Sequence, residues 1–104
     1  MVFVETAVFT RLVCDALSDG DYSALQQELA NHPECGRVIE GGAGIRKTRW
    51  AASGTGKRSG FRIVYYWRPA EDQIYLLYLF AKNSRADLTR AQVKQLAEAA
   101  KALK

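Results

Sequence analysis

The stretch FRIVYYW (Phe61–Trp67), followed after a short turn by IYLLYLFA (Ile74–Ala81), decides the fold class of this 104-residue chain. Both segments are rich in β-branched and aromatic residues, which favour strands. The residues between them include Pro69 and two acidic residues, as is typical of a turn. A further strand is expected just before them, at Ile45–Ala51. Three consecutive strands joined by short loops predict an antiparallel meander.

Helical patterns lie on both sides of these strands. Residues 2–5 alternate weakly and predict a first short strand. Thr6 is expected to cap the first of two helices, and Pro33 to end the second. Thr89 and Gln92 form a capping box at the start of a last helix. The expected order is βααβββα, an α+β fold with the helices on one face of an antiparallel sheet.

The composition is that of one folded domain, residues 1–104, with 48% apolar and 25% charged residues. No apolar run approaches the roughly 18 residues that span a bilayer, and the first residues lack the features of a signal peptide. We therefore expect a cytoplasmic protein with no membrane partner. Two separated cysteines, Cys14 and Cys35, and a single histidine, His32, predict reduced thiols and no metal site.

Charge is distributed unevenly along the chain. Residues 1–40 have a net charge of −5, whereas residues 41–104 have a net charge of +9. The window 41–70 contains seven basic residues and no acidic one. Crowded like charges destabilise a compact state unless a polyanion neutralises them. A nucleic-acid backbone, whose phosphates release counterions on binding, is therefore the expected partner.

Strand alternation divides the basic residues between the two faces of the sheet. In Phe61–Trp67 one face carries only apolar and aromatic side chains, so Arg62 is expected on the other, open face. In the preceding strand the basic residues occur on both faces. Because Trp50 is expected to be buried, Lys47 and Arg49 are placed beside Arg62.

The same open face is expected to offer contacts for bases as well as phosphates. Tyr66 alternates with Arg62 and provides a ring for stacking. Lys82 and Asn83 follow the last strand, where they are expected to close a basic groove. The common alternative is that exposed basic residues only solvate a sheet and protect its edges. The absence of acidic residues from window 41–70 favours the nucleic-acid hypothesis.

Several chemistries are excluded by residue type. The segment GTGKR at 54–58 is similar to a phosphate-binding loop, but Ala51 and Arg58 occupy the positions where that motif needs Gly and Ser/Thr. One histidine outside the groove gives no Ser-His-Asp or Cys-His arrangement. The basic region also lacks the carboxylates that hold Mg²⁺. We therefore expect no cofactor, and any phosphoryl chemistry must be metal-free.

Two segments resemble the HigB branch of the RelE toxin superfamily: GAGIRKTRWAASGTGKRSGFRIVYYW (Gly42–Trp67) and IYLLYLFAKN (Ile74–Asn83). The resemblance implies a toxin of a type II toxin–antitoxin pair that enters the ribosomal A site and cuts the mRNA there. Such toxins use no metal, because the 2′-hydroxyl of the RNA itself attacks the adjacent phosphate. The implied partners are a cognate antitoxin, the ribosome with its rRNA, and mRNA.

The resemblance also implies roles for individual residues. Arg62 corresponds to the strand arginine that stabilises the transition state, and its planar, permanently charged guanidinium suits a phosphate. Lys47 is the candidate base, because surrounding positive charge favours its neutral form. Lys82 is a candidate acid or phosphate ligand. The expected catalytic residues are Lys47, Arg49, Arg62 and Lys82. The residues expected to bind RNA are Arg46, Lys57, Arg58, Tyr66 and Asn83.

Two positions depart from the family pattern. Thr89 stands where some RelE toxins have a tyrosine that stacks on the substrate base, and Asn83 replaces an arginine of RelE proper. The residues alone leave other classes of function open. One is a non-catalytic RNA- or DNA-binding module that uses the same basic groove, and another is an interaction domain for an acidic protein.

Overall fold

The structure is a computed structural model that describes residues 1–50, 60–81 and 88–102. The α+β class and the order of elements expected from the sequence are confirmed, with one additional short strand, β2. A 3₁₀ turn, Pro69–Glu71, joins β4 to β5. The elements are β1 (Val2–Glu5), α1 (Ala7–Ala16), α2 (Asp19–Asn31), β2 (Arg37–Val38), β3 (Arg46–Trp50), β4 (Phe61–Arg68), β5 (Gln73–Ala81) and α3 (Arg90–Ala102).

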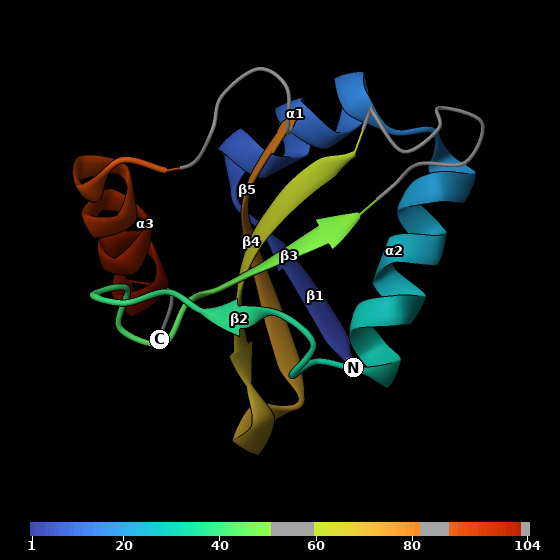
Figure 1. Cartoon of the computed structure of the whole chain (residues 1–104). Helices are drawn as coiled ribbons and strands as arrows, with labels where there is room; N and C mark the ends of the chain where they lie inside the picture. The colour runs from blue at the N-terminus through green and yellow to red at the C-terminus, as the bar shows by residue number, and fades with distance from the viewer. Residues whose placement is uncertain (51–59, 82–87, 103–104) are drawn as a thin grey trace.

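The strands form one five-stranded sheet in the order β1-β5-β4-β3-β2 (Figure 1). The pairs β2–β3, β3–β4 and β4–β5 are antiparallel, as the meander predicted. One edge differs from the expected antiparallel arrangement, because β1 runs parallel to β5. Parallel neighbours need a long crossover between them. Here α1, α2 and the three other strands lie between β1 and β5 in the chain.

Helices α1 and α2 pack on one face of the sheet. Thr6 Oγ1 accepts a hydrogen bond from the Phe9 N–H at 3.0 Å, and Ser18 Oγ accepts one from the Asp21 N–H at 3.1 Å. These N-caps satisfy donors that a helix leaves unpaired in its first turn. The buried side chains of this core come from both helices and from β4 and β5. They are Phe9, Val13, Leu17, Leu25, Leu29, Ile63, Tyr65, Ile74, Leu76 and Leu79.

Helix α3 covers the opposite face, so the expectation that all helices lie on one face is wrong. Figure 1 shows α2 and α3 on opposite sides of the sheet. The predicted capping box is present: the Thr89 N–H donates to Gln92 Oε1 at 2.9 Å, and the Gln92 N–H donates to Thr89 Oγ1 at 3.1 Å. The buried residues of this second core are Ile45, Val64, Tyr75, Leu77, Phe80 and Ala100.

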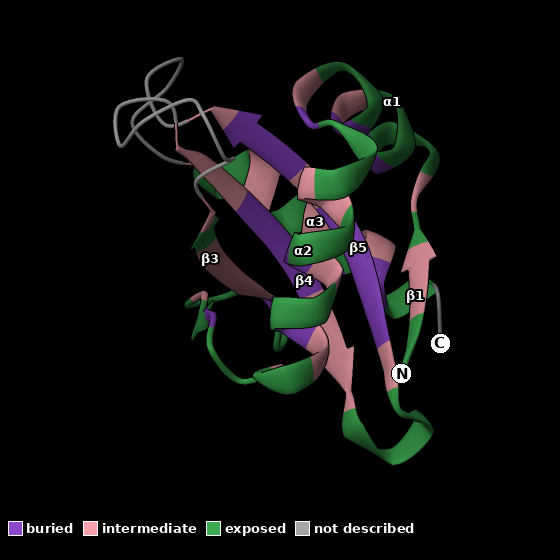
Figure 2. Ribbon diagram, turned by 90° about the vertical axis from the view of Figure 1, so that its right-hand side faces the viewer, coloured by how far each residue is buried: buried purple, intermediate pink, exposed green. Residues whose placement is uncertain are grey.

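The physical reason for this three-layer arrangement lies in β5. Its sequence is apolar at nearly every position, and a strand that is apolar on both faces needs cover on both faces. Figure 2 shows the buried residues concentrated in β4 and β5, at the centre of the sheet. The edge strands β1 and β2 contain no buried residue. No helix within the described residues is long and apolar enough to cross a membrane.

Candidate nucleic-acid interface

Cross-strand pairing determines which basic residues share a face of the sheet. Arg49 lies directly opposite Arg62, and Lys47 lies directly opposite Val64. Residues that face each other across neighbouring strands project to the same side of a sheet. Since Val64 is buried in the core under α3, Lys47, Arg49 and Arg62 all project to the α3 side. The sequence prediction that these three residues lie together is confirmed, and we call them the cationic face.

The cationic face is accessible although α3 packs on the same side. Arg49 is exposed, and Lys47 and Arg62 are half-buried. Helix α3 packs along β5, which lies on the far side of β4 from β3. The β3–β4 half of this side therefore carries the cations, while the β5 half is apolar and covered. The result is a positively charged strip of sheet bordered by a helix.

Arg37, which the sequence analysis did not single out, lies on the same side. It is the first residue of β2 and lies directly opposite Lys47. It falls outside the acid-free window, in a segment where the sequence analysis expected no strand. A two-residue strand gives no periodicity, so the sequence offered no signal for its orientation. The basic residues on the α3 side thus extend over three neighbouring strands.

Arg46 lies on the other side of the sheet, opposite Tyr65. Its Nη1 donates hydrogen bonds to the backbone oxygens of Glu34, at 3.2 Å, and Gly36, at 2.8 Å. The centre of its guanidinium group lies 5.8 Å from the centroid of the Trp67 ring, within range of a cation–π contact. The structure therefore does not bring Arg46 together with the cationic face, and its expected role in RNA binding stays a prediction.

Tyr66, the ring expected to stack on bases, projects to the α3 side but is half-buried among protein atoms. Its centroid lies 6.4 Å from that of Tyr75. The backbone of Gly44 passes close to the ring, and a Cβ at Gly44 would lie 3.2 Å from Tyr66 Cε1. Gly44 also has a φ of +97°, which favours glycine. Stacking of Tyr66 on an RNA base stays a prediction.

Arg68 is the last of the alternate β4 residues that project to the same side as Arg62. Its side chain contacts other residues of the protein. Its Nη1 donates to Tyr75 Oη at 2.9 Å, and its Nη2 lies 3.1 Å from Glu71 Oε1. The hydrogen bond to Tyr75 raises the pKa of the Arg68 guanidinium above its ordinary value, and Glu71 adds to this effect. Arg68 therefore belongs to the turn between β4 and β5 and not to the cationic face.

Several predicted site residues lie outside the described residues. These are Lys82, the candidate acid or phosphate ligand, and the expected RNA ligands Lys57, Arg58 and Asn83. Their roles stay predictions. Within the described residues, no group of three or more His, Cys, Asp or Glu side chains is placed to hold a metal ion. Cys14 and Cys35 are exposed free thiols, and the exposed His32 forms the C-cap of α2.

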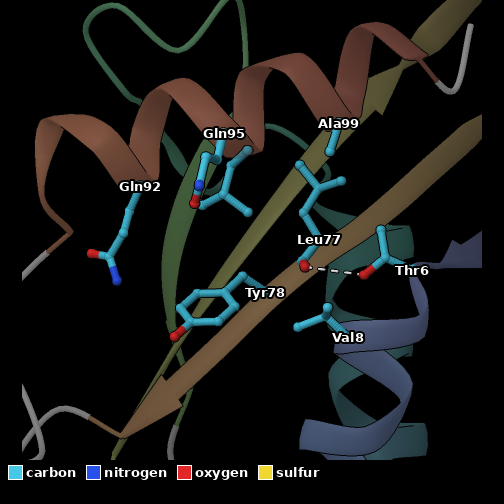
Figure 3. Close-up of a pocket in the computed structure, with 8 residues that line it drawn as sticks. Thr6, Val8, Leu77, Tyr78, Gln92, Gln95 and Ala99 are labelled. Carbon is cyan, nitrogen blue, oxygen red and sulfur yellow. Dashed lines mark hydrogen bonds between the residues drawn. The ribbon is translucent and has the colours of Figure 1, made fainter.

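A hollow of about 310 Å³ lies between α1, β5 and α3 (Figure 3). Its lining residues are Thr6, Val8, Leu77, Tyr78, Gln92, Gln95, Leu96 and Ala99. The Thr6 hydroxyl donates to the Leu77 backbone oxygen at 3.1 Å and ties α1 to β5 at its rim. Because the lining includes no charged residue, this hollow provides no cation for a phosphate.

The described residues form a small α+β domain with a strip of basic side chains on β2, β3 and β4 beside α3. Residues 6–104 match the family described as "RelE toxin of RelE / RelB toxin-antitoxin system". The chain therefore belongs to the RelE toxin family and is the toxin component of a toxin–antitoxin system. Its family also gives it an antitoxin of the RelB type as partner.

Proposed function

We propose that this protein is a ribosome-dependent endoribonuclease that cuts mRNA in the A site without a metal ion. Toxins of the RelE family are generally endoribonucleases. The observation that carries the proposal is the pairing of Arg49 with Arg62 on adjacent strands, beside Lys47. This arrangement concentrates positive charge where a phosphate develops extra negative charge during cleavage. The ribosome and mRNA place the reaction in the cytoplasm.

The proposed reaction is an intramolecular transesterification. The RNA 2′-hydroxyl gives its proton to a base, and its oxygen forms a bond to the adjacent phosphorus. The bond from phosphorus to the 5′-oxygen breaks, and this oxygen takes a proton from an acid. The products are a 2′,3′-cyclic phosphate and a 5′-hydroxyl. The protein must supply a base, an acid and cations for the charge on the pentavalent intermediate.

The cationic face provides candidates for two of these tasks. The guanidinium groups of Arg49 and Arg62 present planar sets of donors that fit phosphate oxygens in pairs. Lys47 is the candidate base, because it lies on the same side of the sheet as Arg49 and Arg62. The acid is assigned to Lys82 on the family resemblance alone. We also assign the antitoxin the task of blocking the cationic face or access to the ribosomal A site.

Primer extension on a defined mRNA, with and without translating ribosomes, tests this function. Cuts that appear only with ribosomes, with 5′-hydroxyl ends downstream of each cut, are the expected result. Cuts on free RNA would contradict the dependence on ribosomes. If no cuts appear but the protein binds RNA in a salt-sensitive way, a non-catalytic RNA- or DNA-binding module is the correct function.

A further inference from the structure

We propose that Arg37 is an additional phosphate-binding residue on the α3 side of the sheet, and that Arg46 and Tyr65 hold it there from the opposite side. The proposal rests on the proposed function, since it adds a contact for the same RNA. It also gives Arg46 a positioning role in place of direct contact with RNA.

Arg37 lies next to the cationic face in the sheet. Arg37 lies opposite Lys47, and the next strand carries Arg62. Neighbouring strands are about 4.8 Å apart, so β2 and β4 are separated by roughly 10 Å. A single-stranded RNA that crosses the strands at the scissile phosphate would meet Arg37 at a neighbouring phosphate. Phosphate contacts of this kind position the strand and do not read its sequence.

The Arg37 side chain is available to bind a phosphate. It is exposed, and no ion pair or side-chain hydrogen bond involves it within the part of the chain that the structure describes. Arg68, in contrast, is engaged by Tyr75 and Glu71. An exposed arginine without an acidic partner loses no internal contact when it binds a phosphate.

Tyr65 fixes the backbone segment before β2. Its side chain is fully buried, and its hydroxyl donates to the Pro33 oxygen at 2.7 Å and accepts from the Gly36 N–H at 2.8 Å. Burial raises the pKa of Tyr65, so the hydroxyl stays protonated and keeps its donor. A Cβ at Gly36 would lie 2.6 Å from Tyr65 Oη, so the backbone just before Arg37 lies directly against this ring.

Arg46 holds the same segment through a second set of contacts. Its Nη1 bonds to the oxygens of Glu34 and Gly36 on either side of Cys35. A two-residue strand has few ladder hydrogen bonds of its own, so these side-chain bonds fix where β2 lies. Arg46 and Tyr65 therefore set the position of Arg37 although they project to the other face.

The test is binding of a 2′-O-methyl RNA oligonucleotide, which lacks the attacking hydroxyl, at several salt concentrations. Arg37→Ala should weaken binding severalfold for any sequence and reduce the slope of log K against log salt by about 0.7, the value for one single-strand phosphate. The matched control is Arg11→Ala, which removes an exposed arginine from α1. Unchanged affinity and slope in Arg37→Ala would overturn the proposal.

A double-mutant cycle tests the positioning role. Arg46→Ala should weaken binding in the wild-type background but add nothing in the Arg37→Ala background, because both changes remove the same contact. Additive losses would show that Arg46 binds RNA itself. Tyr65→Phe, which keeps the ring, provides the same test if Arg46→Ala does not fold. Both experiments measure RNA binding and do not depend on cleavage. If the wild-type protein fails to cut mRNA, that result contradicts the proposed function but leaves this test of Arg37 valid.

Discussion

Arg49 and Arg62 lie directly opposite each other on adjacent antiparallel strands, so both side chains project from neighbouring positions to the α3 side of the sheet. Like charges in directly opposite positions destabilise a sheet. Lys47 projects to the same side and adds to the repulsion. The geometry is therefore unfavourable for the isolated protein and favourable when an anion lies between the two arginines.

Replacing Arg62 with Ala should stabilise the isolated protein at low ionic strength. Relief of the repulsion from Arg49 is expected to raise the free energy of unfolding by about 0.2–1 kcal/mol. Urea unfolding at low salt measures this change, with Arg11→Ala as the control. The gain should disappear near 1 M salt, where the screening length falls to about 3 Å. A gain that persists at high salt would show a cause other than charge repulsion.

Tyr65→Phe should destabilise the protein by about 1–3 kcal/mol. The change leaves the Gly36 N–H and the Pro33 oxygen without their partner in a buried setting. Tyr22→Phe is a suitable comparison, because the Tyr22 hydroxyl donates to an exposed carboxylate oxygen of Glu5. Loss of the Tyr22 hydroxyl should lower the free energy of unfolding less, since water can bond to the exposed Glu5 carboxylate in its place. Equal losses for the two variants in urea unfolding would argue against a buried anchor at Tyr65.

Stability should fall as the pH rises above about 10. The pKa values of Tyr22 and Tyr65 lie above the ordinary value of 10.0, in both cases chiefly because of burial. Between the ordinary and the raised pKa, the unfolded chain releases these protons while the folded protein retains them. The unfolded state then binds fewer protons, so the free energy of unfolding decreases with pH.

Urea unfolding between pH 8 and roughly pH 11.5 measures this decline. Cysteine, tyrosine and lysine side chains all titrate in this range, so the comparison with a Tyr65 variant isolates the contribution of Tyr65. The Tyr65→Phe variant should show a shallower decline than the wild-type protein. An identical slope in the two proteins would contradict the assignment to Tyr65.

Gly36→Ala should destabilise the protein by about 1–3 kcal/mol, the usual cost of overpacking. The new Cβ would lie 2.6 Å from Tyr65 Oη, whose ring is held by the surrounding core. Gly20→Ala is the matched control, because a Cβ at that position in α2 meets nothing within 4 Å. It should stabilise the protein by about 0.5–1 kcal/mol, as alanine favours a helix over glycine. Thermal unfolding of both variants distinguishes the two sites.

The parts of the fold that local sequence determines were predictable. The β4–β5 hairpin follows from two strongly apolar segments around a proline turn. The Thr6 cap and the Thr89–Gln92 capping box follow from short side chains that pair with the nearby backbone. The grouping of Lys47 and Arg49 with Arg62 was also predictable. Successive side chains of a strand project to opposite faces of the sheet, and the expected burial of Trp50 determined which residues of its strand lie on each face.

The parts that depend on distant contacts were not predictable. The parallel pairing of β1 with β5 depends on the path of the chain through two helices. A β-bulge pairs Val64 with Tyr78 but Tyr65 with Leu76, so Leu77 is an extra residue that shifts the alternation of β5. The structural bonds of Arg46 involve a backbone segment about ten residues away. Composition and spacing contain no information on such bonds.

Catalysis by the cationic face is tested most directly by single-turnover cleavage of A-site mRNA by the Arg62→Ala variant. Ribosome binding is measured on the same variant. If the cationic face stabilises the transition state, cleavage should fall by about 10²-fold or more, as for the loss of one donor to a developing oxyanion. Ribosome binding should fall only severalfold, and Arg62→Lys should restore part of the rate. Cleavage that decreases only in proportion to binding would contradict a catalytic role for this face.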